Sequence, residues 1–310
     1  MSILFASPTW PDYKNHFKLA FKKNNLDFND ITTDLQTNSL DVEFIIYDPK
    51  SKLKNFSPFE NAKAILNLWA GVDEIIQNKT LNKPLIRLVD KGMTQGMVEW
   101  CIAHVLRYHL GIDNHIKKQD GVWRSDIIPS LADEITVGIL GLGTLGGAVG
   151  KALAKIGFRV VGWSQTIKSI SNIESYAELT NLKKVLQASQ ILITLLPLTP
   201  QTKYLLNAST LKLLPKNSVL INPGRGLLIK DDDLINLLDS GHIRHATLDV
   251  FSEEPLKSSH PYWKHPNVTV TPHIAAHTRP RSSAETITDS LIKMRRGETP
   301  TGLVDRTKMY

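Results

Sequence analysis

Three polar side chains near the end of the chain are of types used for proton transfer and anion binding. Arg225 lies between two glycines, Glu254 directly precedes a proline, and His273 directly follows another proline. The planar guanidinium of an arginine can bind a carboxylate through two hydrogen bonds. A carboxylate beside an imidazole fixes its tautomer and favours the protonated ring, which can donate a proton near neutral pH. The three residues therefore predict acid–base chemistry on an anionic substrate.

A glycine-rich turn predicts a second kind of chemistry. Its pattern is G-x-G-x-x-G, and it follows the apolar run 135–140 and opens the helical stretch 144–156. In this context the first glycine permits a tight turn, the second lets the backbone approach a pyrophosphate, and the third allows close packing of helix on strand. Free N–H groups at the helix start attract the phosphate. The predicted dinucleotide contacts are Gly141, Gly143, Leu145 and Gly146.

The residues after the next apolar run, 159–163, bear on which dinucleotide binds. A site selective for NAD usually has an acidic residue here, which binds the ribose 2′-hydroxyl. This chain has Ser164, Gln165 and Lys168 in the region, and no acid occurs in 164–168. Without an acid, a 2′-phosphate is not repelled. We expect NADPH as the cofactor, and NADH as the alternative.

The elements that must position these residues are indicated by short apolar runs separated by helical stretches. Six runs in the second half predict one doubly wound parallel sheet: 135–140, 159–163, 191–195, 218–221, 246–249 and 268–271. The catalytic candidates follow the last three of them. Since the carboxyl ends of parallel strands meet at one edge, we expect Arg225, Glu254 and His273 to lie together there.

The first part of the chain shows a smaller series of the same kind. Apolar runs at 3–5, 42–47, 64–67 and 85–88 alternate with polar stretches of helical period. A single long helix is expected from about Thr94 to Lys118, because apolar residues recur there at helical spacing and no proline interrupts them. The whole chain is thus predicted to be an α/β protein.

Composition limits the class of protein. The chain has 310 residues, of which 42% are hydrophobic and 22% charged, so about two globular domains are expected. No run approaches the ~18 apolar residues of a membrane span, and the N-terminus lacks the basic region of a secretory signal. The lone Cys101 cannot form an internal disulfide. We therefore expect no membrane association and a location in the reducing cytoplasm.

The formal net charge of +7 permits binding to anions. Its lysines and arginines are scattered in pairs, with no aromatic-interleaved RNA motif and no zinc-ligand spacing, so no nucleic-acid partner is expected. A modest positive field suits an enzyme whose substrate and cofactor are both anionic.

Four segments together resemble the D-isomer-specific 2-hydroxyacid dehydrogenases, over essentially the whole chain. They are Gly141-Leu-Gly-Thr-Leu-Gly146, Asn222-Pro-Gly-Arg-Gly226, Leu248-Asp-Val-Phe-Ser-Glu-Glu-Pro-Leu256 and Thr271-Pro-His-Ile-Ala-Ala276. Within that family, segments 70–73, 87–93, 275–280 and 304–306 are similar to the bacterial glyoxylate/hydroxypyruvate reductase A branch. That branch tends to carry arginines after the second cofactor strand, where this chain has Gln165 and Ile167. This departure from the branch implies weaker binding of the 2′-phosphate.

The resemblance implies an NADPH-preferring reductase of small 2-keto acids. It implies a Rossmann cofactor domain, residues 99–276, inserted into a smaller flavodoxin-like substrate domain, residues 1–98 and 277–310. It also implies a homodimer. No metal is expected, because Arg225 and His273 would supply both the polarisation and the proton.

The resemblance also implies residue roles. Arg225 would bind the carboxylate and carbonyl of the keto acid, His273 would protonate the carbonyl oxygen, and Glu254 would support the histidine. Glu253 is the competing acid, and Glu254 is preferred because the matching glutamate in the family precedes a proline. Asp249 would bind the nicotinamide carboxamide, and Pro197 is a further expected cofactor contact.

Three substrate contacts are expected from the smaller domain. The backbone of Gly71 and Val72 would meet the substrate carboxylate, and Tyr47 stands where the branch often has a tryptophan over the pocket. Two plainer interpretations stay open: residues 70–73 as a simple strand-to-helix turn, and Tyr47 as an ordinary core residue.

Two other functions also stay open: a non-catalytic NAD(P)-sensing regulator on the same scaffold, and a D-2-hydroxyacid dehydrogenase with another substrate, such as a phosphoglycerate-type or formate dehydrogenase.

Overall fold

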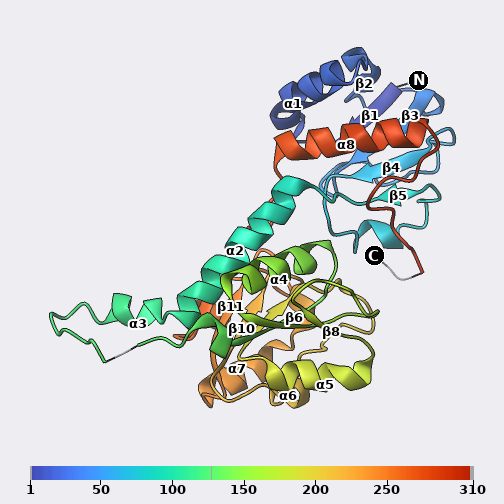
Figure 1. The fold of residues 1–310 in the computed structure, drawn as a ribbon. Helices are drawn as coiled ribbons and strands as arrows, with labels where there is room; N and C mark the ends of the chain where they lie inside the picture. Colours follow the sequence, from blue (N-terminus) through green and yellow to red (C-terminus); the bar gives the residue numbers. More distant parts are fainter. Residues whose placement is uncertain (1, 127, 308–310) are drawn as a thin grey trace. The chain divides into compact units, whose positions relative to one another are not determined.

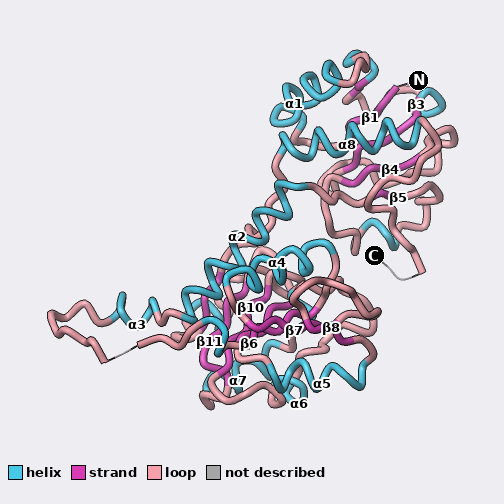
Figure 2. Tube along the Cα trace, viewed as in Figure 1, coloured by secondary structure: helices cyan, strands magenta, loops and turns pink. Residues whose placement is uncertain are grey.

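The computed structural model describes residues 2–126 and 128–307 (Figures 1 and 2). The chain divides into two compact units, the first comprising Met1–Met93 with Thr278–Tyr310 and the second Thr94–His277. Each unit contains one parallel sheet, of five and seven strands, which confirms the predicted α/β fold. The predicted domain boundaries, 98/99 and 276/277, lie a few residues from these borders. The substrate- and cofactor-binding roles of the two units stay predictions.

The first unit is built on a five-stranded sheet with the order β2-β1-β3-β4-β5. Its strands are β1 (Ser2–Ala6), β2 (Ile31–Thr32), β3 (Val42–Tyr47), β4 (Ala64–Asn67) and β5 (Leu85–Ile86), and its helices are α1 (Trp10–Lys23) and α8 (Pro280–Arg295). Figure 1 shows α1 and α8, from opposite ends of the chain, packed side by side. The two-residue edge strand β2 was not predicted, because so short a segment carries no recognisable period.

A buried carboxylate ties the C-terminal helix of this unit to its sheet. Glu43 on β3 has a side chain only 6% exposed, and its Oε1 lies 2.8 Å from Nζ of Lys63. Its Oε2 accepts hydrogen bonds from Nη2 and Nε of Arg295 on α8, at 2.8 and 3.0 Å. Burial alone would raise the pKa of Glu43, but the hydrogen bonds and charges of Lys63 and Arg295 lower it below its ordinary value.

The second unit contains a seven-stranded sheet with the order β12-β11-β10-β9-β6-β7-β8. Its strands are β6 (Thr136–Leu140), β7 (Arg159–Trp163), β8 (Glu174–Tyr176), β9 (Ile191–Thr194), β10 (Ser218–Asn222), β11 (Ile243–Leu248) and β12 (Val268–Val270). The six predicted strands are all present and parallel. The edge strand β8 was missed because it is three residues long and half polar.

Helices cover both faces of this sheet, as the doubly wound prediction requires. Successive side chains of a strand point to opposite faces, so Ile191 and Ile193 of β9 join one buried cluster while Leu192 joins the other. The first cluster includes side chains of α2 (Lys91–His109) and α4 (Thr144–Ile156). The second includes side chains of α5 (Leu179–Ala188), α6 (Ala208–Leu211) and α7 (Asp231–Asp239).

The long helix predicted from Thr94 to Lys118 is wrong in one respect, since the structure has two helices there. Helix α2 ends at His109, and α3 (Ile112–Lys117) begins after Gly111. Gly111 has φ +63°, a left-handed conformation that an α-helix cannot continue through. Within the part of the chain that the structure describes, neither helix nor any other is long and apolar enough to cross a membrane.

Replacement of the buried carboxylate tests how far it holds the C-terminal helix. We expect Glu43→Gln to lower the free energy of unfolding by about 2 kcal/mol at pH 7, because a neutral amide replaces the carboxylate that pairs with Lys63 and Arg295. Since the folded pKa of Glu43 is lowered, this difference is fully present above the ordinary glutamate pKa and shrinks as the pH falls through the folded value. Urea unfolding at pH 7 and pH 4 measures it. The exposed Glu60→Gln is the control, and equal stability of both variants at pH 7 would refute the role of Glu43.

Candidate active site

All the catalytic and cofactor-binding candidates of the second unit lie at one edge of the seven-stranded sheet. Every strand pair in this sheet is parallel, so all carboxyl ends lie on this edge. The glycine turn follows β6, Ser164 follows β7 and Pro197 follows β9. Arg225 follows β10, Asp249 and Glu254 follow β11, and His273 follows β12. In the order of the sheet, the catalytic candidates thus occupy one half of the edge together with Asp249, and the other dinucleotide candidates occupy the other half.

The glycine turn has the geometry of a pyrophosphate cradle. Gly141 has φ +103°, and a Cβ there would lie 2.5 Å from the carbonyl oxygen of Leu195. A Cβ on Gly146 would lie 1.8 Å from the carbonyl oxygen of Gly141, so helix and turn touch backbone to backbone. A Cβ on Gly143, in contrast, would enter open space. Gly143 also begins α4 without a capping side chain, which leaves the first helical amides, including that of Leu145, without an intrahelical acceptor. The residues therefore fit a dinucleotide.

The segment after β7 is held by local hydrogen bonds. The Ser164 hydroxyl donates to the carbonyl oxygen of Thr166 at 2.8 Å, and the Lys168 amide donates to Oγ of Ser175 at 3.0 Å. The side chains of Gln165 and Lys168 are exposed. At β9, the carbonyl oxygen of Pro197 accepts a hydrogen bond from the Thr202 hydroxyl at 2.7 Å. The cofactor contacts of these residues stay predictions.

The structure brings His273 and Glu254 into contact. Nδ1 of His273 lies 2.7 Å from Oε2 of Glu254, and Oε1 of Glu254 accepts a hydrogen bond from the Phe251 amide at 2.9 Å. Burial alone would raise the pKa of Glu254, but the hydrogen bonds from His273 and Phe251 and the charges of His273 and Arg225 lower it. The carboxylate is therefore ionised at neutral pH and accepts a hydrogen bond from the N–H at Nδ1 of His273.

The neighbouring acid, Glu253, pairs with a lysine and not with His273. Glu253 pairs with Lys257 at 2.7 Å, and both side chains are about two-thirds exposed. Glu254, and not Glu253, is thus the acid beside the imidazole.

The backbone of His273 is unusual. It has φ +54°, which few residues other than glycine adopt. Its amide donates to the carbonyl oxygen of Asp249 at 2.8 Å, which fixes this conformation. Uncommon backbone conformations of this kind persist where the surroundings hold them and are frequent at functional sites.

Asp249 is buried to a degree that sequence reasoning did not anticipate. Its carboxylate is fully buried, and Oδ1 accepts hydrogen bonds from the Thr271 hydroxyl at 2.6 Å and the Ile274 amide at 2.9 Å. Oδ2 accepts one from the Ala275 amide at 2.9 Å. Asp249 therefore holds the loop that carries His273. The expected contact to a nicotinamide carboxamide stays a prediction.

Arg225 lies on a loop that packs directly against the loop of Glu254. A Cβ on Gly226 would lie 1.9 Å from the carbonyl carbon of Phe251, so only glycine allows this approach. Asn222 closes the loop from the other side, donating through Nδ2 to the carbonyl oxygen of Arg225 at 3.0 Å. The guanidinium is half-buried, and its Nη1 donates to the carbonyl oxygen of Gly224 at 2.8 Å.

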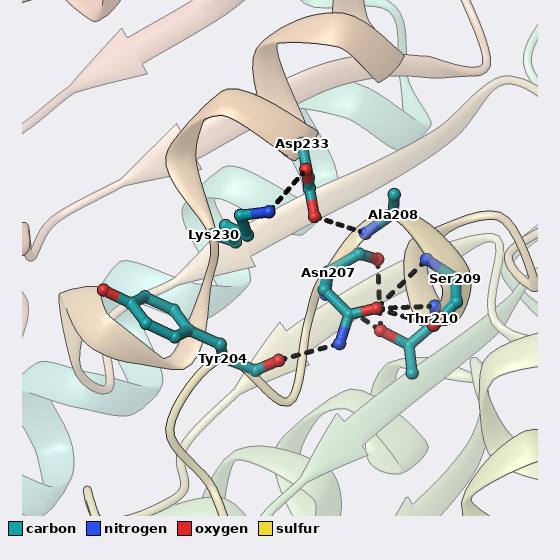
Figure 3. Close-up of polar contacts among 7 residues, drawn as sticks. All are labelled: Tyr204, Asn207, Ala208, Ser209, Thr210, Lys230 and Asp233. Atoms are coloured by element: carbon teal, nitrogen blue, oxygen red, sulfur yellow. Dashed lines mark hydrogen bonds and ion pairs between the residues drawn. The ribbon is translucent and has the colours of Figure 1, made fainter.

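The segment that follows Arg225 is anchored by a polar cluster that sequence reasoning missed (Figure 3). Asp233 accepts a hydrogen bond from the Ala208 amide at 2.8 Å and lies 3.4 Å from Nζ of Lys230. Asn207 caps the short helix α6 by accepting from the amides of Ser209 and Thr210. The only signal in the sequence was the spacing of Asn207 and Thr210, which is typical of a helix start.

The comparison with protein families agrees with this geometry. Residues 100–275 match the family described as D-isomer specific 2-hydroxyacid dehydrogenase, NAD binding domain. The chain belongs to this family. The resemblance seen in the sequence is therefore confirmed, and the chain is an NAD(P)-dependent 2-hydroxyacid dehydrogenase. That its active site lies at this edge of the seven-stranded sheet stays a prediction.

Characterised relatives are similar over most of the chain. The glyoxylate/hydroxypyruvate reductase A of Yersinia enterocolitica is 41% identical over 256 residues, which cover 80% of this chain and 82% of the relative. A 2-hydroxyacid dehydrogenase of Xanthobacter autotrophicus, solved with NADPH and MES, is 35% identical with a TM-score of 0.91, covering 100% and 99% of the two chains. The NADPH-dependent glyoxylate/hydroxypyruvate reductase of Sinorhizobium meliloti, solved with NADP and sulfate, is 30% identical with a TM-score of 0.86 and full coverage of both.

Three of the substrate-contact candidates, Tyr47, Gly71 and Val72, lie in the first unit. Tyr47 ends β3 with 4% exposure and packs edge-on against Phe56, at a centroid distance of 5.2 Å, which favours the core interpretation. Gly71 and Val72 lie in the loop after β4, and the Val72 side chain is buried. Their substrate contacts stay predictions. Among residues 2–126 and 128–307, no three His, Cys, Asp or Glu side chains gather in a way that could hold a metal ion.

The open space at Gly143 offers a test of the cofactor cradle. We expect Gly143→Ala to raise the Kd of NADPH by about tenfold or more, because the added methyl group occupies space that a phosphate needs. The melting temperature should not fall, since the methyl group meets no atom of the free protein. NADPH fluorescence titration and thermal unfolding measure the two effects. Gly96→Ala, whose Cβ makes only an ordinary contact at 3.6 Å, is the control. Unchanged NADPH affinity in Gly143→Ala would count against the cradle.

Proposed function

We propose that this 2-hydroxyacid dehydrogenase uses NADPH to reduce the small 2-keto acids glyoxylate and hydroxypyruvate to glycolate and D-glycerate. The observation that carries the proposal is the 2.7 Å contact between Nδ1 of His273 and Oε2 of Glu254, at the sheet edge that also carries Arg225 and the glycine turn. The names of the Yersinia and Sinorhizobium relatives support this choice of substrate.

The proposed chemistry follows from the proton positions. Glu254 accepts the hydrogen bond of Nδ1, so Nε2 of His273 is the ring nitrogen left to hold a proton for the carbonyl oxygen. Arg225 binds the substrate carboxylate. Its fixed positive charge also stabilises the negative charge that develops on the carbonyl oxygen of the keto acid. NADPH, when bound on the glycine turn, supplies the hydride that adds to C2.

The preference for NADPH rests on residues 164–168. No acid there repels a 2′-phosphate, and the exposed Lys168 offers a positive charge. The Xanthobacter and Sinorhizobium relatives were solved with NADPH and NADP, which supports the same choice. Gln165 and Ile167 offer no further positive charge, so NADH remains the alternative cofactor.

The homodimer also stays a prediction. Large apolar side chains are exposed along residues 110–126 and 128–131, where Trp123 is 92% exposed and Ile128 83% exposed. Apolar surface of this extent is typical of a surface that a second chain covers, which supports self-association.

The direct test is absorbance at 340 nm with NADPH or NADH and with glyoxylate, hydroxypyruvate or pyruvate. We expect the fastest oxidation with NADPH and one of the first two acids. Faster turnover with NADH would overturn the cofactor preference, and a marked preference for another acid would favour a different dehydrogenase. Tight NADPH binding without turnover on any keto acid would instead favour the NAD(P)-sensing regulator.

Replacement of Arg225 separates turnover from cofactor binding. We expect Arg225→Ala to lower kcat/KM for glyoxylate by about 100-fold or more, because charge on the carbonyl oxygen is no longer stabilised. The Kd of NADPH should stay within about twofold, since the residue faces the substrate. Arg281→Ala, which removes an arginine that is 83% exposed in the other unit, is the control. Loss of NADPH binding by a folded Arg225→Ala protein would contradict the assigned role.

A further inference from the structure

Asn67 is a buried polar residue at the end of an otherwise apolar strand of the first unit. It is the last residue of β4, it has no exposed surface, and it follows Ala64, Ile65 and Leu66. Its Nδ2 donates two hydrogen bonds, one to the carbonyl oxygen of Trp69 and one to that of Gly71, both at 2.9 Å. Both amide hydrogens of the side chain are thus used by the loop that follows the strand.

These hydrogen bonds orient two peptide groups of the loop. The C=O and N–H of a trans peptide point in opposite directions. Because the carbonyl groups of Trp69 and Gly71 point to Asn67, the amides of Ala70 and Val72 point away from it. No described residue accepts a hydrogen bond from the amides of Ala70, Gly71 or Val72. The loop therefore presents unpaired N–H groups, which is the usual backbone arrangement for binding an anion.

The two carbonyl groups differ in how far they depend on Asn67. The carbonyl oxygen of Trp69 also accepts a hydrogen bond from the Leu88 amide at 3.0 Å, so the start of the loop has a second support. For the carbonyl oxygen of Gly71, Asn67 is the one donor among the residues described. The orientation of the Gly71–Val72 peptide is thus the feature that should change when the asparagine is lost.

The amide oxygen of Asn67 is evidence against a purely structural role of this residue. Its Oδ1 is buried and has no hydrogen-bond partner in the part of the chain that the structure describes. A buried acceptor without a partner destabilises a fold, and an apolar residue of similar volume would avoid that cost. An amide is required here only because two loop carbonyl groups need two donors.

We propose that Asn67 is a positioning residue, which fixes the backbone amides of Ala70 and Val72 in the orientation that binds the substrate carboxylate. The inference rests on the proposed function and on the contact that the family resemblance implies between the backbone of Gly71 and Val72 and the carboxylate that Arg225 also binds. It adds a residue that touches no substrate and acts through the loop. Removal of the asparagine should weaken binding of the keto acid more than it slows the chemical step. The reason is that the contact to the carboxylate stabilises the bound substrate and the transition state equally, so its loss raises KM and leaves kcat nearly unchanged.

Asn67→Leu is the decisive variant, because leucine keeps the branching and the number of heavy atoms of the side chain and removes both donors. We expect KM for glyoxylate to rise about tenfold or more, with kcat within about threefold and the Kd of NADPH unchanged. Binding of oxalate, a carboxylate that is not reduced, should weaken by a similar factor in calorimetry with NADPH present. Thr288→Val is the matched control, since it removes a buried hydroxyl that donates to the Ala284 carbonyl oxygen within α8. If Asn67→Leu does not fold, Asn67→Ser replaces it, because a hydroxyl donates only one hydrogen bond.

The outcomes separate this inference from the proposed function. Wild-type KM and oxalate affinity in a folded Asn67→Leu protein, or the same losses in Thr288→Val, would overturn the role of Asn67. A wild-type protein that reduces no keto acid but binds oxalate in a way that depends on Asn67 would overturn the proposed function and keep the role of the loop. A wild-type protein that does not bind oxalate would overturn the inference even if it reduces glyoxylate.

Discussion

The buried carboxylate of Asp249 is the interaction on which the arrangement of the catalytic candidates depends. A carboxylate without contact to water is stable in a protein only when hydrogen bonds replace its hydration. Asp249 receives three of them, all from residues 271–275, and its own carbonyl oxygen accepts the amide of His273. The end of β11 thereby fixes the loop after β12, including the left-handed backbone of His273. These contacts within the protein hold the backbone of His273 in place.

Glycine permits the second contact between loops at this edge. Gly226 brings the backbone that follows Arg225 against the backbone of Phe251, and the Phe251 amide holds the carboxylate of Glu254. The arginine, the glutamate and the histidine are thus joined through main-chain contacts as well as through charge. Charges placed by backbone in this way need little rearrangement when charge develops on a substrate, which is the main electrostatic contribution to catalysis.

Much of this site could be predicted from the sequence because its signals are local. The glycine spacing, the apolar runs and the position of each polar residue after a run are all visible in short segments, and parallel pairing then brings distant residues to one edge. The choice of Glu254 over Glu253 as the partner of His273 came from the family resemblance, in which the matching glutamate precedes a proline, and the structure shows that contact. The same logic located Asp249 at the edge but not its burial, because its partners are backbone amides more than twenty residues further along the chain.

Other features lacked a usable signal or had one that was overlooked. The edge strands β2 and β8 are too short for a period to show. The break between α2 and α3 was visible as Gly111, but helical spacing on either side outweighed a single glycine. Asn67 belongs to no recognisable motif. Its proposed role depends on the direction of two carbonyl groups, which only the three-dimensional structure shows.

Turnover by His273→Gln tests the central claim most directly, since glutamine keeps a polar side chain but cannot deliver a proton. Hydroxypyruvate reduction would be followed with NADPH, with cofactor affinity measured separately by fluorescence and His265→Gln as the control. The account predicts that kcat falls by about 100-fold or more while NADPH affinity stays within about twofold of the wild type. A kcat within a few-fold of the wild type would contradict it.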